Sequence, residues 1–485
     1  MGKTVTSLRN FVNGSWVLSE ATEYLEVENP GTGETLGIVP LSTRRDVDQA
    51  VRSAKTAFEE WSRVPILERQ QYLFKMKQIL EEHLGELAEI ITYEHGKILP
   101  EARGEVKRAI ENIDYAISAP ALMQGRILAN AASGVDVEMQ YFPEGVFAIV
   151  SPFNFPAMIP FWFLPHAIIM GNTVVVKPSE QVPLTMARVF ELLEKVTFPP
   201  GVINLVNGDK QAVDSLISHP ELRGVASVSS TPVMKYIASE AHQYGKKFLC
   251  NGGAKNFIVV MPDADIDEHL PNILGSIYGN TGQRCLAGSN VVAVGGISSQ
   301  FRMKVKEAVN NLRVGYGLDR DSQMGPLVSK KARERVTGYV EQGIREGARL
   351  AVDGRALTLS KYPGGYYLGP MIFEDVDPRS TIARDEIFGP VLIHLEAKNL
   401  EDALSFIEKS PYGNAASIYT TDPRAIRTFV MDVRAGNIGV NIGVPAPIAY
   451  FPFAGMKESF MGMLHGQSDE AFRFFSDIKV VTKRI

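Results

Sequence analysis

The chain has 485 residues, too many for a single hydrophobic core, so two or three domains are expected. Its charged residues are scattered and sum to a formal net charge of -5, which argues against a nucleic-acid-binding surface. Two cysteines cannot form a disulfide framework in so long a chain, and they are typical of a reducing compartment. The opening segment MGKTVTSLRNFVNGSW lacks the apolar core of a signal peptide, so we expect a cytoplasmic protein.

The first third of the chain is predicted to be mainly helical after a short β-rich lead. Apolar residues recur at helical spacing over Asp46–Phe58 and Leu67–Leu84, and Gly85–Glu94 continues the pattern. Pro100 is placed to open a further helix. In contrast, Arg126–Phe142 consists of two β-rich halves around a Ser-Gly turn, which predicts a hairpin.

The segment Val146–Val176 contains no Asp, Glu, Lys or Arg and is long enough to cross a bilayer. A membrane helix is nevertheless disfavoured, because prolines interrupt the segment every four or five residues and a spanning helix would lose its backbone hydrogen bonds. A buried strand, a tight loop and a buried helix explain the pattern better, and no membrane partner is expected.

From Gly145 onward, short β-rich runs alternate with helical stretches such as Leu184–Lys195 and Gln211–Ser218. The β-rich runs are GVFAIVS, NTVVVKP, GVINLVNG, GVASVSS and KKFLCNG. This alternation predicts a parallel, doubly wound sheet that binds ligands at the carboxyl ends of its strands. The runs IVVM, VVAVGG and VLIHL, after Phe257, predict a second α/β domain, and Asp477–Ile485 suits an edge strand.

Cys285 is the strongest candidate for a catalytic residue. It lies in a run of small and polar residues, where a glycine-rich backbone admits a substrate and leaves N–H groups free for an oxyanion. The positive charge of the adjacent Arg284 is expected to favour the reactive thiolate. The alternative is that Cys285 is only a small buried apolar residue.

Several motifs in succession support the catalytic interpretation. These are SPFNFPAMIPFW, GNTVVVKPSE, GQRC at the cysteine, DEIFGPV at Asp385–Val391 and YGNAASIYTTD at Tyr412–Asp422. In this order and spacing they resemble the aldehyde dehydrogenase superfamily over essentially the whole chain. The resemblance implies an α/β fold with a Rossmann-like cofactor domain, an α/β catalytic domain and a small β hairpin for oligomerisation.

The resemblance also implies domain boundaries. We expect the NAD-binding domain at 1–121 and 143–252, the catalytic domain at 253–460 and the oligomerisation segment at 122–142 and 461–485. An exposed β ribbon needs a partner for its edge, so a homodimer or homotetramer is implied.

Within the superfamily, the segment around Asn251 resembles the methylmalonate-semialdehyde dehydrogenase branch, as does NIGVPAPIAYFPF at Asn441–Phe453. Most members carry a glutamate in place of Asn251, as the general base that activates water, whereas this branch has asparagine and transfers its acyl group to coenzyme A. An asparagine cannot usefully accept a proton, and a thiol nucleophile needs less help than water does. Alternatively, Asn251 only caps the end of a strand.

The remaining roles are implied by the same resemblance. Asn154 is expected to donate a side-chain N–H to the oxyanion, alongside the backbone N–H of Cys285. Lys177 and Glu180 are expected at the adenine ribose, where a carboxylate favours NAD over NADP, unless they form only a surface ion pair. The other residues expected along the cofactor are Ser151, Phe153, Ser230, Glu386 and Phe388, the last being otherwise a core aromatic.

Arg108, Arg284 and Phe155 are expected at the substrate. A planar, permanently charged guanidinium suits a substrate carboxylate. Arg108 lies off the apolar stripe of its predicted helix, so a solvated surface arginine is its alternative, and structural pairing is the alternative for Arg284. No metal site is expected.

The chain departs from the family pattern in two places. Ser229 and Met234 replace glycines that usually lie near the cofactor pyrophosphate, although Pro232 still fits a first helical turn. Gly252, next to Asn251, replaces a larger residue. These departures leave two alternatives to a coenzyme A-acylating enzyme, namely a hydrolytic dehydrogenase of another small aldehyde and a catalytically silent protein of the same fold.

Overall fold

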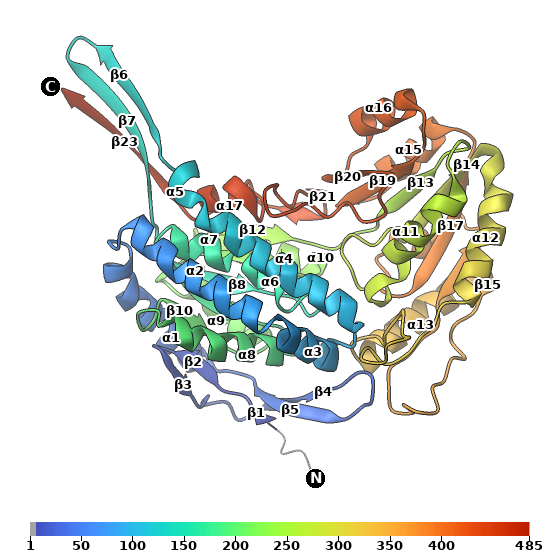
Figure 1. Ribbon diagram of the computed structural model, residues 1–485, viewed down its shortest axis with the longest axis horizontal. Helices are drawn as coiled ribbons and strands as arrows, with labels where there is room; N and C mark the ends of the chain where they lie inside the picture. The colour runs from blue at the N-terminus through green and yellow to red at the C-terminus, as the bar shows by residue number, and fades with distance from the viewer. Residues whose placement is uncertain (1–5, 485) are drawn as a thin grey trace.

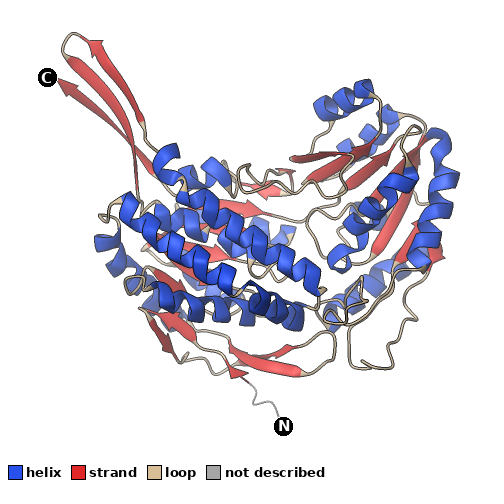
Figure 2. Cartoon of the chain, viewed as in Figure 1, coloured by secondary structure: helices blue, strands red, loops and turns tan. Residues whose placement is uncertain are grey.

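The computed structural model describes residues 6–484. Two large sheets, each covered by helices on both faces, lie side by side, and a long β ribbon projects from the first of them (Figures 1 and 2). This is the α/β architecture that the sequence predicts, and the fold class is confirmed.

The first sheet has eight strands and contains the alternating run that begins at Gly145. In spatial order they are β22 (Phe460–Met461), β12 (Lys247–Asn251), β11 (Leu222–Val228), β8 (Val146–Val150), β9 (Thr173–Lys177), β10 (Ile203–Leu205), β2 (Asn10–Val12) and β3 (Ser15–Val17). The five strands from β12 to β10 are parallel, and the chain first moves outward on one side of β8 and then on the other. This reversal between β8 and β11 creates the crevice in which doubly wound sheets bind ligands.

Alternate residues of β8 pack on opposite faces of the sheet. Val146, Ala148 and Val150 join a core formed with α1 (Arg44–Trp61), α9 (Lys210–Ser218) and α10 (Thr231–Gln243). Phe147 and Ile149 join a core formed with other helices, which are α2 (Ile66–Glu82), α3 (Leu84–His95), α4 (Leu99–Ile117), α7 (Leu164–Ile169) and α8 (Leu184–Leu193). Burial on both faces explains why this strand is uniformly apolar.

The second sheet has seven strands, parallel except for β15. In spatial order they are β15 (Arg349–Val352), β16 (Met371–Glu374), β17 (Val391–Ala397), β14 (Asn290–Val294), β13 (Phe257–Val260), β19 (Ala415–Tyr419) and β20 (Asn437–Val440). One face packs on α11 (Ile266–Tyr278) and α12 (Ser298–Asn310). The other packs on α13 (Lys330–Arg345), α14 (Thr381–Arg384), α15 (Leu400–Lys409) and α16 (Pro423–Asp432).

The remaining elements are short. They are β1 (Thr6–Ser7), β5 (Thr35–Pro40) and β4 (Tyr24–Glu28) in one small sheet, β18 (Tyr412–Gly413) and β21 (Met456–Lys457) in another, and the helices α5 (Ala119–Leu122), α6 (Met158–Phe161) and α17 (Ser468–Phe474). The domain boundaries stay a prediction. Strand β22 lies across the expected boundary at residue 460 and pairs with β12 of the first sheet.

The structure refines two predictions of secondary structure. The helical pattern before Glu94 belongs to two helices rather than a continuous one, because α2 ends at Glu82 and α3 begins at Leu84. The uncharged segment Val146–Val176 forms β8, α6, α7 and most of β9. It therefore contains strands and short helices rather than a membrane helix, as predicted. Within residues 6–484, no helix combines the length and apolar character needed to span a bilayer.

The projecting ribbon has three strands, in the order β23 (Asp477–Arg484), β7 (Val135–Phe142) and β6 (Arg126–Ala132). The hairpin prediction is confirmed, and β23 pairs with β7 from Asp477 opposite Phe142 to Arg484 opposite Val135. Strand β6 is an edge whose seven residues are all exposed, Ile127 to 65% and Leu128 to 63%. An exposed edge with apolar side chains is expected to be covered by another chain.

We therefore predict that replacing Ile127 and Leu128 together by lysine lowers the assembly state of the protein, because charge on both faces of an edge strand blocks strand pairing. Sedimentation velocity measures the change, and circular dichroism should show an unaltered fold. Leu18→Lys, at a comparably exposed apolar position, is the control. An unchanged sedimentation coefficient for the double variant would show that this edge does not mediate assembly.

Candidate active site

A cavity of about 710 Å³ lies at the carboxyl ends of β8, β9 and β11. It brings together nine of the residues predicted from the sequence, which are Ser151, Phe153, Asn154, Lys177, Glu180, Ser230, Cys285, Glu386 and Phe388. Four predicted residues do not line it, namely Arg108, Phe155, Asn251 and Arg284. The loop that carries Cys285 comes from the second sheet, so the cavity joins the two halves of the molecule.

The loop before Cys285 has an unusual backbone. Asn280, Thr281 and Gly282 all have positive φ angles, of 53°, 55° and 72°, which a β-branched threonine rarely adopts. A Cβ atom on Gly282 would lie 2.1 Å from the carbonyl oxygen of Gly389, so only glycine fits there. Strain of this kind costs about 1–3 kcal/mol per residue and persists where the surrounding structure enforces it, often at functional sites.

Cys285 is held by its backbone carbonyl, which accepts hydrogen bonds of 2.8 Å from the side-chain amides of Asn256 and Asn414. Burial raises the pKa of its thiol to about 12, and the nearby Glu386 carboxylate contributes to the rise. Hydrogen bonds from Asn414 and from the backbone of Leu286 oppose this shift. The thiol is therefore protonated in this state and needs activation.

The structure contradicts the expectation that Arg284 favours the thiolate. Its guanidinium donates to Glu101 at 2.8 Å and to the carbonyl of Gly275 at 3.2 Å, so its charge is already paired. It lines a separate cavity of about 820 Å³, to which α11 and the segment that follows α12 (Ser298–Asn310) contribute most residues. This is the structural pairing considered as the alternative role. Arg108, in contrast, lines neither this cavity nor the cavity of Cys285. It is partly exposed and paired with Glu111 at 3.0 Å.

Asn154 lies directly beside the nucleophile loop. Its side-chain amide donates to the carbonyl of Gln283 at 3.0 Å, two residues before Cys285, and its own carbonyl accepts from Lys97 at 2.7 Å. The ring of the next residue, Phe155, lies under the Lys97 ammonium with 4.2 Å between the nitrogen and the ring centroid. An amide NH2 group carries two donors, so Asn154 can donate near Cys285 without releasing Gln283.

The groove away from Cys285 fits a dinucleotide. The N-terminus of α10 opens into it at Ser229, Ser230 and Pro232, and the side chain of the N-cap residue Ser230 does not cap the backbone N–H groups there. Such an end binds phosphate. Lys177 and Glu180 form an ion pair of 3.1 Å that lines the cavity, with the Lys177 side chain only 6% exposed, so it is not a solvated surface pair.

The other end of the groove is formed by the loop that contains Glu386 and Phe388. Burial raises the pKa of Glu386 to about 7, although its carboxylate accepts a hydrogen bond of 2.8 Å from the backbone N–H of Ala254. Phe388 has a φ of 55° and lies edge-to-face with Phe153 at 5.8 Å. A strained aromatic exposed to the cavity is more consistent with a binding surface than with a core residue.

Two residues of this region were not predicted. Arg335, on α13, lines the cavity and donates to the backbone carbonyls of Glu386 and Phe388 at 3.4 and 3.5 Å. Lys255 is fully buried, its ammonium has no hydrogen-bond partner among the described residues, and burial lowers its pKa to about 7. Lys255 lies in the segment that contains Asn251, which is a signal that could have identified it, whereas no motif marks Arg335.

Asn251 is the last residue of β12 and is buried. Both polar atoms of its side chain are inaccessible and make no hydrogen bond with residues 6–484, which does not support a role in capping the strand. A buried amide without a partner costs about 1–3 kcal/mol. It lies immediately before Gly252, which lines the cavity with Cys285.

Met234 and Gly252, two of the residues that depart from the family pattern, complement each other in size. The buried side chain of Met234 occupies the space beside Gly252, where an added Cβ atom would lie 2.7 Å from the Met234 sulfur. A larger residue at 234 thus compensates for a smaller one at 252. The change leaves the N-terminus of α10 open to the cavity.

The strand order, the crevice and the cysteine loop together are those of an α/β dehydrogenase with a cysteine at the junction of its two halves. The chain belongs to the aldehyde dehydrogenase family, whose model matches residues 16–481. It is therefore an oxidoreductase that acts on aldehydes, and the resemblance seen in the sequence is confirmed.

Similar proteins support a narrower relationship. Malonate-semialdehyde dehydrogenase 1 of Geobacillus kaustophilus is 45% identical, with 99% of this chain and 98% of the relative covered. The crystal structure of a methylmalonate-semialdehyde dehydrogenase from Oceanimonas doudoroffii has a TM-score of 0.97 and 39% identity over 99% of both chains. A structure described as this enzyme from Sinorhizobium meliloti, in complex with NAD, has a TM-score of 0.98 and 38% identity, covering 100% of this chain and 99% of that one.

We predict that alkylation of Cys285 by iodoacetamide becomes about tenfold faster per pH unit from about pH 7 to about pH 10 in the ligand-free protein, because only the thiolate reacts. Glu386→Gln removes a negative charge, so it should lower the Cys285 pKa and accelerate the reaction above about pH 7. Peptide mass spectrometry measures the rate, with the buried Cys250 as internal control. A plateau below about pH 8, or slower alkylation of the variant, would contradict the prediction.

A second prediction concerns the complementary pair. Met234→Ala should destabilise the protein by about 2–5 kcal/mol through a cavity, and Gly252→Ala by about 1–3 kcal/mol through a clash. Combined, the two changes should cost at least about 1 kcal/mol less than their sum, because the new methyl group enters the space that the methionine leaves. Urea denaturation of the four proteins measures the coupling. Strictly additive effects would show that the two side chains do not share this space.

Proposed function

We propose that the protein oxidises methylmalonate or malonate semialdehyde with NAD and transfers the acyl group to coenzyme A. The products are propanoyl-CoA or acetyl-CoA, with loss of carbon dioxide. The observation that carries the proposal is Asn251, a buried amide whose side chain has no hydrogen-bond partner among the residues that the structure describes, at the position where most of the family has a water-activating carboxylate. The names of the similar proteins point to the same substrates.

The reaction begins with attack of the Cys285 sulfur on the aldehyde carbon. The amide of Asn154 and the backbone N–H of Cys285 stabilise the oxyanion. The Asn154 amide carries two N–H donors, so it can keep its hydrogen bond to Gln283 and donate the other N–H to the new charge. When bound, NAD supplies the hydride acceptor. Glu180 would accept from the adenine ribose and disfavour a 2′-phosphate, and Phe388, which lines the same cavity, would help to hold the nicotinamide.

The second half of the reaction, in which the thioester is broken down, depends on the absence of a carboxylate at position 251. An asparagine at 251 cannot accept a proton from water, so the thioester survives until the thiol of coenzyme A attacks it. Arg284 and Arg108 are the candidates for the substrate carboxylate. Arg284 is paired with Glu101 and lines the separate cavity, so a substrate carboxylate would have to reach its guanidinium from that side.

One observation favours a hydrolytic alternative. Glu386 lines the cavity with Cys285, and its pKa of about 7 suits a general base at neutral pH. The catalytically silent alternative is weaker, because the replacement of glycine by Met234 is matched by Gly252 and the groove remains open.

We further propose a homodimer or homotetramer built through the ribbon, and a cytoplasmic location consistent with two unpaired cysteines.

The deciding experiment combines the purified protein with NAD, methylmalonate semialdehyde and coenzyme A, and identifies the products by mass. We expect propanoyl-CoA and carbon dioxide, little turnover without coenzyme A, and weaker activity with NADP. Cys285→Ala should reduce kcat about a thousandfold or more, whereas the buried Cys250→Ser should retain activity. Free acid formed at the same rate with or without coenzyme A would refute acyl transfer and support hydrolysis.

A further inference from the structure

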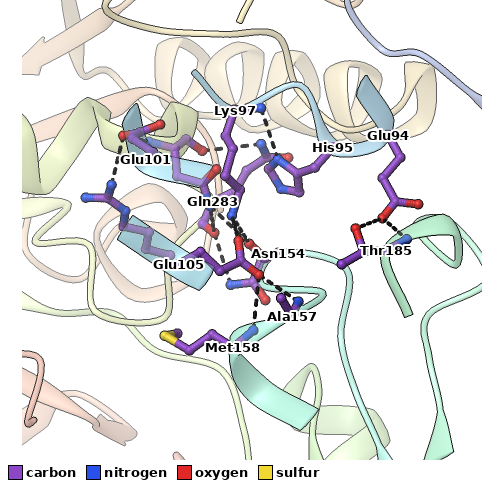
Figure 3. A network of polar contacts seen from close by, with 12 residues as sticks. Glu94, His95, Lys97, Glu101, Glu105, Asn154, Ala157, Met158, Thr185 and Gln283 are labelled. Carbon is purple, nitrogen blue, oxygen red and sulfur yellow. Dashed lines mark hydrogen bonds and ion pairs between the residues drawn. The ribbon is translucent and has the colours of Figure 1, made fainter. Parts of the chain in front are cut away.

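Helix α4 carries a row of charged residues that points into the protein rather than toward solvent. Glu101 and Glu105 are four residues apart and share one face of the helix, and Lys97 lies just before its start (Figure 3). The side chains of Lys97 and Glu105 are completely buried, and that of Glu101 is 16% exposed. This row reaches both loops of the active site.

Lys97 and Glu105 hold the loop that contains Asn154. The Lys97 ammonium donates to Glu105 at 2.6 Å and to the backbone carbonyl of Asn154 at 2.7 Å. The second oxygen of Glu105 accepts from the backbone N–H groups of Ala157 and Met158 at 2.8 and 3.3 Å. The ion pair therefore fixes the loop on both sides of Phe155.

Glu101 holds the nucleophile loop from the same helix. One of its oxygens accepts from the backbone N–H of Asn280 and from the Arg284 guanidinium, both at 2.8 Å. Asn280 has a positive φ, so this contact lies at the strained part of the loop. The two loops also meet directly, because the amides of Asn154 and Asn280 both donate to the carbonyl of Gln283 at 3.0 Å.

Stability alone does not explain a completely buried ion pair. The desolvation of two charges commonly offsets their attraction, and apolar residues of similar size often serve a fold equally well. A buried, hydrogen-bonded charge pair does fix geometry, since each partner has a narrow set of allowed positions. Here the fixed groups are the two loops whose relative position determines where an oxyanion meets its donors.

We propose that Lys97, Glu101 and Glu105 are positioning residues that set the Asn154 amide against the backbone of Cys285. They touch neither substrate nor cofactor and act through the two loops. The proposal rests on the proposed function, in which Asn154 stabilises the oxyanion that precedes hydride transfer.

The test compares Lys97→Met, Glu105→Gln and the double variant with wild type. Glu144→Gln is the control, because the side chain of Glu144 is also inaccessible to solvent and is paired, with the partly exposed Lys247 and Arg223, at the opposite end of β8. Each protein is assayed for the burst of NADH in a single turnover, which precedes the acyl transfer. Melting temperature and the dissociation constant for NAD are measured alongside.

We expect each single variant to lose about a hundredfold in burst rate, as when an oxyanion donor is misplaced, with NAD affinity within about twofold of wild type. The double variant should have a higher melting temperature than the single variants, because no unpaired charge remains. Its burst rate should stay as low as theirs. The control should lose melting temperature and keep its burst. A double variant with the wild-type burst rate, or a control as slow as the single variants, would overturn the proposal.

Hydrogen–deuterium exchange of residues 279–286 provides a readout without substrate. The Lys97→Met variant should exchange faster there than wild type and Glu144→Gln, although this loop belongs to the other sheet. Unchanged exchange would also overturn the proposal. If the wild-type protein shows no burst with any aldehyde, the proposed function fails, and this exchange experiment still decides whether α4 holds the loop.

Discussion

The position of β8 between β9 and β11 is the constraint on which the site depends. Because helices cover both faces of this sheet, polar loops can leave it only at the strand ends. The chain reverses direction between β8 and β11, so their carboxyl ends diverge and leave a crevice. Ser151 to Asn154 follow β8, Ser229 and Ser230 follow β11, and each lines the cavity for this reason.

The strand–helix pattern of the sequence predicted where this half of the site lies, and the family resemblance supplied its individual residues. Alternating strands and helices define a parallel sheet, and the residues that follow each strand must then converge. Glu386 and Phe388 are less accessible to such reasoning. They come from the second sheet, and only the family resemblance places them in the groove.

The prediction that the charge of Arg284 favours the Cys285 thiolate was wrong, because the local sequence does not reveal which group a long charged side chain pairs with. Arg284 is adjacent to Cys285, yet its guanidinium turns to Glu101, which is 183 residues away. Met234 and Gly252 each depart from the family pattern in the sequence, and only the structure shows that the two residues are in contact. Arg335 acts through backbone carbonyls of another segment, and such contacts leave no residue pattern to read.

Burial dominates the electrostatics of the site. Cys285, Glu386 and Lys255 all have pKa values shifted toward their neutral forms, and burial is the largest cause for each of them. Because the Glu386 charge raises the Cys285 pKa, the coupling must be reciprocal. Any ligand that donates hydrogen bonds to the Glu386 carboxylate withdraws part of its charge from the thiol and lowers the thiol pKa. This effect acts against burial, which is the larger cause of the raised Cys285 pKa. Glu386 therefore couples what binds in the groove to the protonation of the nucleophile.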